Sequence, residues 1–375
     1  MSMEKKHFGN RSRLQVSPVS IGAMRFPADT MDAVALIRRA IDRGMVYIDT
    51  SRGYGESELI LGRALKNGYR EKVILSSKCS PWIKKVQDND DGSADSVRRR
   101  IEETMIRLDT DYLDFYQVWN INTPEAWATA TRKGGMVDGI RKAMDEGLVR
   151  HTGFTTHEDP ERLLGYLDQA DWAEIILVSY NLLQHDYAKV LKKAHGMGIG
   201  TVVMNPCGGG RFSADNEILM ALAREVGAVS VADLAIRYVH SNPYVDTMLC
   251  GMSKTSDVDD SIASVDRGRF SPEQLETIER FFRDRSPAKI KFCTGCNYCM
   301  PCPQGIKIPG IMELIYNDRV LGMKQTSINE YQYSWVVGQT ADHCIKCGAC
   351  EKKCTQQLEI IKELQYAHRT YSKPK

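Results

Sequence analysis

The sequence predicts a (β/α)₈ barrel followed by a smaller, cysteine-rich domain. Short apolar runs that are rich in β-branched residues alternate with longer amphipathic segments from about residue 14 to residue 253. The eight apolar runs mostly lack the in–out alternation of half-exposed strands, which is typical of parallel strands buried on both faces. Eight strands with interleaved helices over roughly 250 residues favour a barrel over its rival, an open doubly wound sheet. No Gly-x-Gly-x-x-Gly follows an early strand, which also favours the barrel.

The elements are expected in the following order along the chain. Strands are expected at residues 16–22, 46–49, 73–77, 113–118, 151–154, 175–179, 201–205 and 246–251. Helices are expected at residues 31–44, 93–109, 124–147, 160–170, 185–198, 216–227, 230–241, 254–265 and 271–284. The first helix has its apolar residues at helical spacing and ends at Gly44, and the second begins after Ser93, a favourable N-cap.

A linker near residue 285 divides the chain into two expected domains, residues 1–285 and residues 286–375. The 50 Lys and Arg residues against 48 Asp and Glu residues give a formal charge of +2. This balance provides no electrostatic basis for binding nucleic acid or an anionic membrane. The longest purely aliphatic run, residues 33–37, is far shorter than the roughly 20 residues of a membrane span. The first residues lack the apolar stretch of a secretory signal, so we expect a cytoplasmic protein.

Eight of the eleven cysteines lie in the second domain, in two runs. Clustered thiols in a reducing compartment usually hold metal rather than form disulfides. The first run is Cys293-x₂-Cys296-x₂-Cys299-x₂-Cys302, and the second is Cys344-x₂-Cys347-x₂-Cys350-x₃-Cys354. Three thiolates at every third position let one loop wrap a cubane, whereas a pair of zinc sites, the alternative, needs only Cys-x₂-Cys pairs.

The two runs therefore predict two [4Fe–4S] clusters. In two-cluster ferredoxins the fourth cysteine of each run ligates the other cluster. The first cluster is expected on Cys293, Cys296, Cys299 and Cys354, and the second on Cys302, Cys344, Cys347 and Cys350. The second domain has a formal charge of +5, which two clusters of about −2 each would nearly cancel. The remaining cysteines are expected to be small buried apolar residues: Cys79, Cys207 and Cys250.

Four side chains stand where expected barrel strands end, the place where barrels carry catalytic residues: Asp49, Tyr54, Lys78 and Trp119. A tyrosine has a pKa near 10, and a neighbouring ammonium lowers it, so that the phenol can exchange a proton near neutral pH. We predict Tyr54 as the general acid/base, with Asp49 holding Lys78 in place and keeping it charged. Each residue taken singly is more often structural or solvated.

Two stretches of the barrel region resemble the aldo-keto reductase family. Residues 49–58, DTSRGYGESE, resemble the signature of that family, and residues 251–254, GMSK, resemble its late cofactor-binding turn. Tyr180-Asn181 is similar to the family's tyrosine that stacks on nicotinamide. Residues 299–305, CMPCPQG, resemble the branch of the family fused to a ferredoxin-like domain. Together these resemblances extend over nearly the whole chain.

The resemblance implies NAD(P)H-dependent carbonyl reduction of a small molecule, with Tyr54 as the acid. The cofactor would lie on the loops after the seventh and eighth strands, which are the usual phosphate region of barrels. The residues implied to bind it are Thr155, Tyr180, Asn205, Gly208, Gly251, Ser253 and Lys254. Gly208 to Gly210 permit a close approach of the backbone, and Lys254 would pair with a 2′-phosphate, which indicates NADPH over NADH.

The chain also departs from the family's pattern. Trp119 stands where the family has a histidine that orients the carbonyl, and an indole donates a hydrogen bond but cannot carry a proton. Thr155, Thr156 and Leu177 replace groups that hold the carboxamide, and Ser261 replaces an asparagine near the adenine. Three polar residues near the same face are able to take over the role of the histidine: Asn120, Asn122 and His157.

Two functions therefore stay open. The first is a reductase, in which the clusters are structural, regulatory or a path to an external electron carrier, because a nicotinamide delivers two electrons and a cubane one. The second is a lyase or isomerase that uses Tyr54 and Lys78 as an acid/base pair, with clusters that staple the domain or dock a partner. Exposed cubanes are oxygen-sensitive, so we expect an anaerobic or low-oxygen setting.

Overall fold

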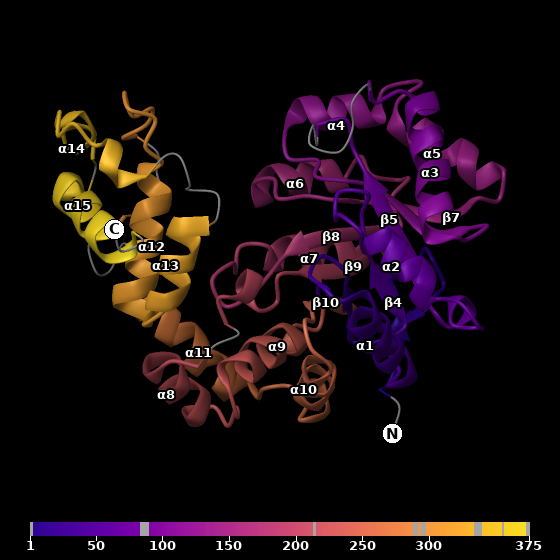
Figure 1. Cartoon of the computed structure of the whole chain (residues 1–375), viewed down its shortest axis with the longest axis horizontal. Coiled ribbons are helices and arrows are strands. Elements are labelled where there is room, and N and C mark those ends of the chain that lie inside the picture. Colours follow the sequence, from indigo (N-terminus) through magenta and orange to yellow (C-terminus); the bar gives the residue numbers. More distant parts are fainter. Residues whose placement is uncertain are drawn as a thin grey trace. The chain divides into compact units, whose positions relative to one another are not determined.

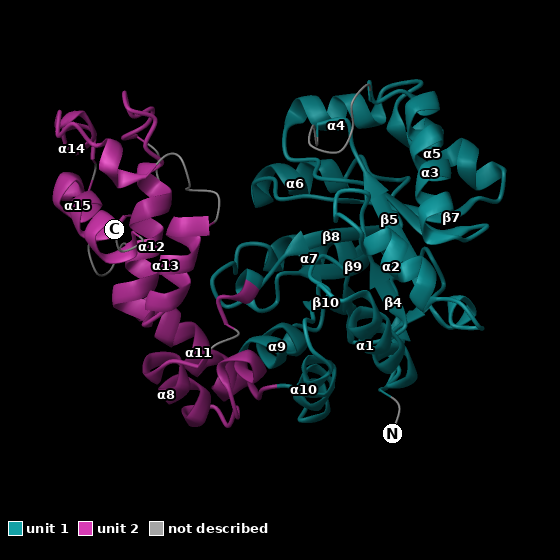
Figure 2. Cartoon of the chain, viewed as in Figure 1, with its two compact units in different colours: residues 1–209, 235–269 teal, residues 210–234, 270–375 magenta. Residues whose placement is uncertain are grey.

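The computed structural model describes residues 3–82, 90–212, 215–287, 292–293, 298–333, 340–354 and 356–372 (Figure 1). The chain forms two compact units (Figure 2). The first consists of Met1–Gly209 and Ala235–Arg269, and the second of Gly210–Leu234 and Phe270–Lys375. The domain boundary expected near residue 285 stays a prediction.

A closed barrel of eight parallel strands forms the centre of the first unit. Its strands are β3 (Val19–Gly22), β4 (Tyr47–Asp49), β5 (Ile74–Cys79), β6 (Leu113–Val118), β7 (Val149–Thr155), β8 (Ile175–Ser179), β9 (Gly200–Met204) and β10 (Thr247–Gly251). The last strand pairs with the first, Met248 opposite Val19, which closes the sheet. The expected barrel is therefore confirmed, and the open sheet is excluded.

Helices alternate with these strands. They are α1 (Thr30–Asp42), α2 (Ser57–Ala64), α3 (Ala94–Leu108), α4 (Pro124–Thr131), α5 (Met136–Asp145), α6 (Pro160–Leu167), α7 (Ala188–Gly196), α8 (Glu217–Glu225), α9 (Val231–Ser241) and α10 (Thr255–Asp266). Local sequence explains their starts: the Asp29 carboxylate accepts hydrogen bonds from the first turn of α1, and the Ser93 hydroxyl caps α3. The helix α2 was not predicted from the sequence.

The single helix expected over residues 124–147 is wrong, because the chain forms α4 and α5 with a break between them. Gly134 has a φ of +71°, a left-handed conformation that favours glycine. A Cβ on Gly135 would lie 2.7 Å from the carbonyl oxygen of Thr129, so a larger residue does not fit there. The glycine pair therefore ends one helix and turns the chain into the next.

A short hairpin closes the amino end of the barrel. It consists of β1 (Lys6–His7) and β2 (Gln15–Val16), and Phe8 extends from it into the core. The Phe8 ring lies 5.3 Å from that of Tyr47 and 5.5 Å from that of Phe115, and all three rings are buried. Because these aromatic rings fill the amino end, the opposite end is left for a functional site.

The second unit is helical in the part that the structure describes. Besides α8 it contains α11 (Pro272–Asp284), α12 (Ile308–Leu321), α13 (Lys324–Tyr333), α14 (Ala349–Lys352) and α15 (Ile360–Tyr371). Buried residues of α12 and α15, such as Ile315 and Leu364, form its core. Arg211 donates two hydrogen bonds to Glu330, of 2.8 and 3.0 Å, and one of 3.1 Å to Glu313. Among the described helices, none combines the length and apolarity needed to cross a bilayer.

Candidate functional site

The carboxyl end of the barrel brings together the four side chains that the sequence singled out for catalysis. Asp49 is the last residue of β4, and Lys78 lies near the end of β5. Trp119 directly follows β6, and Tyr54 lies between β4 and α2. Because parallel strands end at one rim, residues up to 70 positions apart in the sequence meet here.

Lys78 is the central group of this cluster. Its side chain is almost completely buried, and Nζ donates hydrogen bonds to Asp49 Oδ1 and to the Thr50 carbonyl oxygen, the latter at 2.8 Å. Nζ lies 4.9 Å from the centroid of the Tyr54 ring. Burial by itself would lower the pKa of Lys78, but the charges and hydrogen bonds of Asp49 and Tyr54 outweigh it and raise the pKa. The lysine therefore stays an ammonium.

The pKa of Tyr54 is raised, whereas the sequence predicts that Lys78 lowers it. Burial raises the pKa of the phenol above 10, and the opposing effect of the Lys78 ammonium does not overcome it. The expected net lowering of the pKa is therefore wrong for the protein without bound ligands, because desolvation of the phenolate exceeds its attraction to Lys78. The phenol keeps its proton at neutral pH, which suits a group that donates a proton.

Gln117 is a buried partner of this cluster that was not predicted from the sequence. Its Nε2 donates hydrogen bonds of 3.0 Å to Asp49 Oδ2 and 2.8 Å to Ser76 Oγ. The Asp49 carboxylate is thus held by Lys78 on one oxygen and by Gln117 on the other. The signal was a polar residue inside the apolar run of β6, at the position paired with Lys78 in β5.

Trp119 forms a wall beside the phenol. Its ring meets that of Tyr54 edge-to-face, with centroids 5.7 Å apart and an interplanar angle of 87°. The carbonyl oxygen of Trp119 accepts hydrogen bonds from Trp82 Nε1, at 2.8 Å, and from Ser80 Oγ. The indole therefore limits the space next to Tyr54 without adding a titratable group.

Of the three polar residues offered as replacements for a histidine, Asn122 and His157 contact each other, and Asn120 contacts Thr155. Asn122 Oδ1 accepts a 2.7 Å hydrogen bond from the backbone N–H of His157. His157 Nδ1 lies 3.4 Å from Ser179 Oγ, and burial lowers the pKa of the imidazole, so it is neutral at pH 7. The backbone N–H of Asn120 donates to Thr155 Oγ1 at 2.9 Å, which uses one lone pair of that hydroxyl.

Other residues implied to bind the nicotinamide lie at the same rim. Tyr180 follows β8, is buried, and stacks on Tyr238 with ring centroids 5.6 Å apart. Asn205 follows β9 with a φ of +57°, and its Nδ2 donates to Ser179 Oγ at 3.4 Å. Leu177 packs in the barrel core, so it contributes no polar group to this rim.

Two glycines provide open space where the resemblance implies phosphate groups. A Cβ on Gly209, in the short turn Gly208–Gly210, or on Gly251, at the end of β10, would meet no atom within 4 Å. Arg25 Nη1 donates a 2.8 Å hydrogen bond to the Gly209 carbonyl oxygen and is exposed. An open glycine turn beside a guanidinium fits an anionic group such as a pyrophosphate. Arg25 was missed, since its partner lies 184 residues further along the chain.

The start of α10 already holds a carboxylate of the protein. Asp257 Oδ2 accepts hydrogen bonds from the backbone N–H groups of Ser253, at 2.8 Å, and of Lys254, at 3.1 Å. The Lys254 side chain is 71% exposed, and its Nζ lies 4.0 Å from Asp257. Asp257 therefore occupies the amides and competes for the lysine that would otherwise attract a 2′-phosphate.

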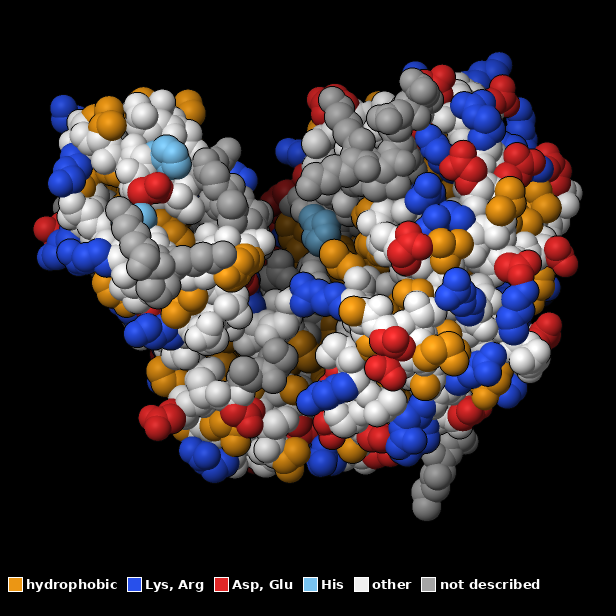
Figure 3. Space-filling view, viewed as in Figure 1, with side chains coloured by type: hydrophobic (Ala, Val, Ile, Leu, Met, Phe, Trp, Pro, Cys, Tyr) orange, Lys and Arg blue, Asp and Glu red, His pale blue; other side chains and the backbone are white. Residues whose placement is uncertain are grey.

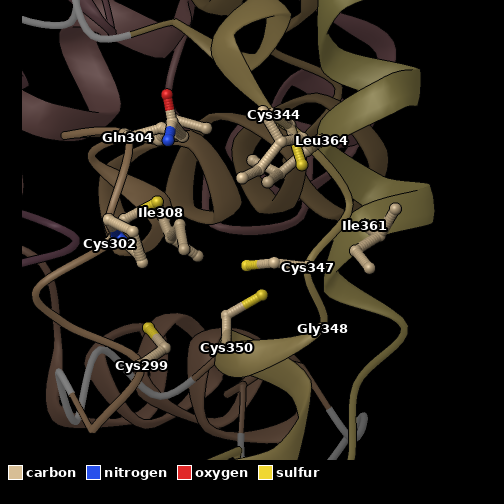
Figure 4. Close-up of a pocket in the computed structure, with 13 residues that line it drawn as sticks. Cys299, Cys302, Gln304, Ile308, Cys344, Cys347, Gly348, Cys350, Ile361 and Leu364 are labelled. Atoms are coloured by element: carbon tan, nitrogen blue, oxygen red, sulfur yellow. The ribbon is translucent and has the colours of Figure 1, made fainter.

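One cavity in the second unit gathers cysteines from both runs (Figure 4). It is lined by Cys299, Cys302, Cys344, Cys347 and Cys350, together with apolar side chains such as Ile308 and Leu364. The two other described cysteines of the runs, Cys293 and Cys354, pack against the same apolar core. Cys296 lies outside the described residues.

The spacing of these cysteines fits a cluster. In the described part of the chain no three His, Cys, Asp or Glu side chains converge on a point where a single metal ion would sit. Five cysteines nevertheless line one cavity, which suits a cubane, whose ligand sulfurs lie farther apart than those around one zinc ion. Cys79 and Cys250 are buried as expected, and Cys207 is half-buried.

Known oxidoreductases resemble this chain in sequence. Residues 18–283 match the Aldo/keto reductase family, and residues 292–360 match the 4Fe-4S dicluster domain. The chain is 27% identical over 314 residues to the uncharacterized oxidoreductase YrpG of Bacillus subtilis. The aligned region covers 70% of this chain and 91% of that protein. It is 27% identical over 291 residues to L-galactose dehydrogenase of Arabidopsis thaliana, which covers 70% of this chain and 88% of that protein.

The barrel also resembles a solved structure. The holo form of aldo-keto reductase AKR11C1 from Bacillus halodurans superposes with a TM-score of 0.64 at 23% identity, covering 74% of this chain and 96% of that one. Its apo form superposes with a TM-score of 0.59. At this identity the likeness supports the fold of the barrel.

Proposed function

The chain belongs to the aldo-keto reductase family and carries a 4Fe-4S dicluster domain, and from this premise we propose that it is an NAD(P)H-dependent enzyme that reduces a carbonyl or oxidises an alcohol. The observation that carries the proposal is the buried Lys78–Asp49 ion pair beside Tyr54. A buried ammonium next to a protonated phenol is an arrangement for proton transfer at a fixed point.

The residues of the rim divide the work as follows. A nicotinamide, when bound, would supply the hydride that the carbonyl carbon receives. The Tyr54 phenol donates its proton to the carbonyl oxygen, which becomes the hydroxyl of the alcohol. Lys78 stabilises the phenolate left behind, because its ammonium lies beside the ring and stays charged. Asp49 and Gln117 hold Lys78 in position, and Trp119 limits how a substrate approaches Tyr54.

We assign the cofactor to the loops at the same rim. The proposed contacts are Thr155, Tyr180, Asn205, Gly208, Gly251, Ser253 and Lys254, with Arg25 added for the pyrophosphate. The open space at Gly209 and Gly251 supports this assignment.

Replacement of Arg25 by alanine is expected to weaken the binding of NADH and NADPH about tenfold, because one charge-assisted hydrogen bond to phosphate is lost. Dissociation constants from tryptophan fluorescence test this expectation. Arg141→Ala removes an exposed arginine from α5 and serves as the matched control. Equal affinities of the two variants would exclude Arg25 from the cofactor site.

Replacement of Asp257 by asparagine is expected to tighten NADPH binding about fivefold relative to NADH, since a negative charge beside the 2′-phosphate is removed. The amide oxygen of asparagine can still accept hydrogen bonds from the backbone N–H groups of Ser253 and Lys254, so the start of α10 is expected to be preserved. Asp266→Asn removes the same charge from the other end of α10 and is expected to leave the ratio unchanged. An unchanged ratio in Asp257→Asn would place the 2′-phosphate elsewhere.

We assign residues 286–375 to a domain with two [4Fe–4S] clusters, and residues 1–285 to the barrel. One cluster would be held by Cys302, Cys344, Cys347 and Cys350, which line one cavity. The other would be held by Cys293, Cys296, Cys299 and Cys354. Because exposed cubanes are oxygen-sensitive, we expect a cytoplasmic setting with little oxygen.

An anaerobic titration of the iron-loaded protein with NADPH and NADH tests the proposed function. Trp119 lies at the rim, so saturable quenching of tryptophan fluorescence is expected, and bleaching of the cluster absorbance would report electron transfer to iron. Absence of binding at millimolar concentration would favour the second candidate, a lyase or isomerase that uses Tyr54 and Lys78. The replacement of carboxamide-binding groups, notably by the buried Leu177, is the observation in favour of that candidate.

A further inference from the structure

Apolar side chains are exposed next to the cysteines of the cluster cavity. Ile345 lies between Cys344 and Lys346, lines the cavity and is 63% exposed. Tyr298, next to Cys299, is also 63% exposed. Single exposed apolar residues are ordinary, but these two flank cysteines of one cavity. Cys347 is itself exposed, so this cavity is open to the surface of the second unit.

Three lysines lie within two residues of cysteines of the second run in the sequence. Lys346, Lys352 and Lys353 are exposed and make no ion pair with any residue that the structure describes. The nearby acids are engaged: Glu351 Oε1 accepts a hydrogen bond from the Ile361 backbone at 2.9 Å, and Asp342 accepts one from Thr340. In Figure 3, separate basic side chains lie along the edge of the unit where Figure 1 shows α14.

The conformation of Lys346 adds to this observation. Its φ is +60°, in the left-handed region that glycine and asparagine occupy at lower cost. The backbone at this position thus gives no reason for a lysine. The exposed side chain makes no ion pair with any described residue, so its ammonium is available to a partner.

We infer that Ile345, Lys346, Lys352, Lys353 and Tyr298 form the docking surface for a small acidic protein that carries a one-electron cofactor. The inference rests on the proposed function, since it requires the cluster on Cys347. Protein interfaces typically have an apolar centre and a polar or charged rim. Opposite charges raise the rate of encounter, and short-lived redox complexes use small interfaces of this kind.

The electron balance at this surface is simple. The reduced carrier loses one electron, the oxidised cluster gains it, and no covalent bond or proton changes place. The exposed ligand Cys347 brings the cluster close to the partner. Such a carrier delivers electrons one at a time, as a cubane accepts them, whereas a nicotinamide delivers two electrons together as a hydride.

A stopped-flow experiment with an acidic flavodoxin hydroquinone as the probe tests the inference. The anaerobic, iron-loaded full chain is mixed with the probe, and bleaching of the cluster gives a second-order rate constant. The triple variant K346E/K352E/K353E is expected to react at least tenfold more slowly at low ionic strength, and to lose most of the salt dependence. K324E changes an exposed lysine of α13 and is expected to stay within about twofold of the unmodified chain.

Two further measurements separate this inference from the proposed function. Iron content and reduction by dithionite are measured for every variant, and both are expected to be unchanged, because none of the lysines is a cluster ligand. Absence of iron–sulfur clusters in the unmodified chain would overturn the cluster assignment itself. Clusters that dithionite reduces but flavodoxin does not, or a slowing by K324E equal to that of the triple variant, would overturn the docking surface alone. Ile345→Gln, which keeps every charge, is expected to slow the reaction at high ionic strength as well.

Discussion

Tyr54→Phe is expected to lower kcat for carbonyl reduction about 10³-fold, while the dissociation constant of the nicotinamide changes less than about twofold. The variant removes the only hydrogen that the phenol can give to the carbonyl oxygen, and general acid catalysis contributes about 10²- to 10⁴-fold. The ring and its edge-to-face contact with Trp119 are kept, so the fold is expected to persist. Steady-state kinetics with an aldehyde panel and fluorescence titration supply the two numbers.

The pH dependence gives this prediction a second test. Because burial raises the pKa of Tyr54, the phenol is protonated through neutral pH, and reduction is expected to fall only as the pH rises through that raised pKa. Lys78→Met removes the group that opposes the shift, so it raises the pKa of Tyr54 further. Alcohol oxidation, which needs the phenolate, is therefore expected to suffer most in Lys78→Met. Full turnover by Tyr54→Phe would exclude both the reductase and the acid/base alternative.

Cys347→Ser is expected to lower the iron content from about eight to about four atoms per chain, because one cubane loses an exposed ligand. The cavity is lined by the cysteines and by side chains of α15 that belong to the apolar core of the second unit. Loss of the cluster is therefore also expected to destabilise that unit. Iron and sulfide analysis and thermal unfolding under anaerobic conditions measure these effects. Cofactor binding at the barrel rim is expected to stay unchanged.

Cys207→Ser is the matched control for iron content, since Cys207 lies outside both runs. It is expected to keep all eight iron atoms. A loss of all iron in Cys347→Ser would mean that the two clusters assemble together, and an unchanged iron content would remove Cys347 from the ligand set.

The proposed hydride chemistry and the proposed clusters differ in the number of electrons they move. Hydride chemistry at Tyr54 moves two electrons, and each cubane moves one. The docking surface proposed near Cys347 would give single electrons a route to the clusters. Whether the two chemistries exchange electrons is decided by cluster bleaching in the titration with NADPH.

Much of the fold followed from local patterns. The runs at 113–118 and 175–179 are strands with those same bounds, because short, mainly apolar segments suit strands that are buried on both faces. The break at Gly134 and Gly135 was missed, although both glycines are visible in the sequence. Whether a glycine pair continues a helix or ends it depends on the left-handed turn that the surrounding fold requires.

The sequence by itself determined the order of the strands, the cysteine spacing that indicates cubanes, and which residues stand at strand ends. Only the tertiary structure decided which of these residues contact one another, and which charges and buried surroundings set their pKa values. Gln117 reaches Asp49, Arg25 reaches Gly209, and Asp257 fills the start of α10 because barrel closure and loop paths set those distances. The raised pKa of Tyr54 has the same origin, since desolvation depends on everything packed around a group and not on its neighbours in sequence.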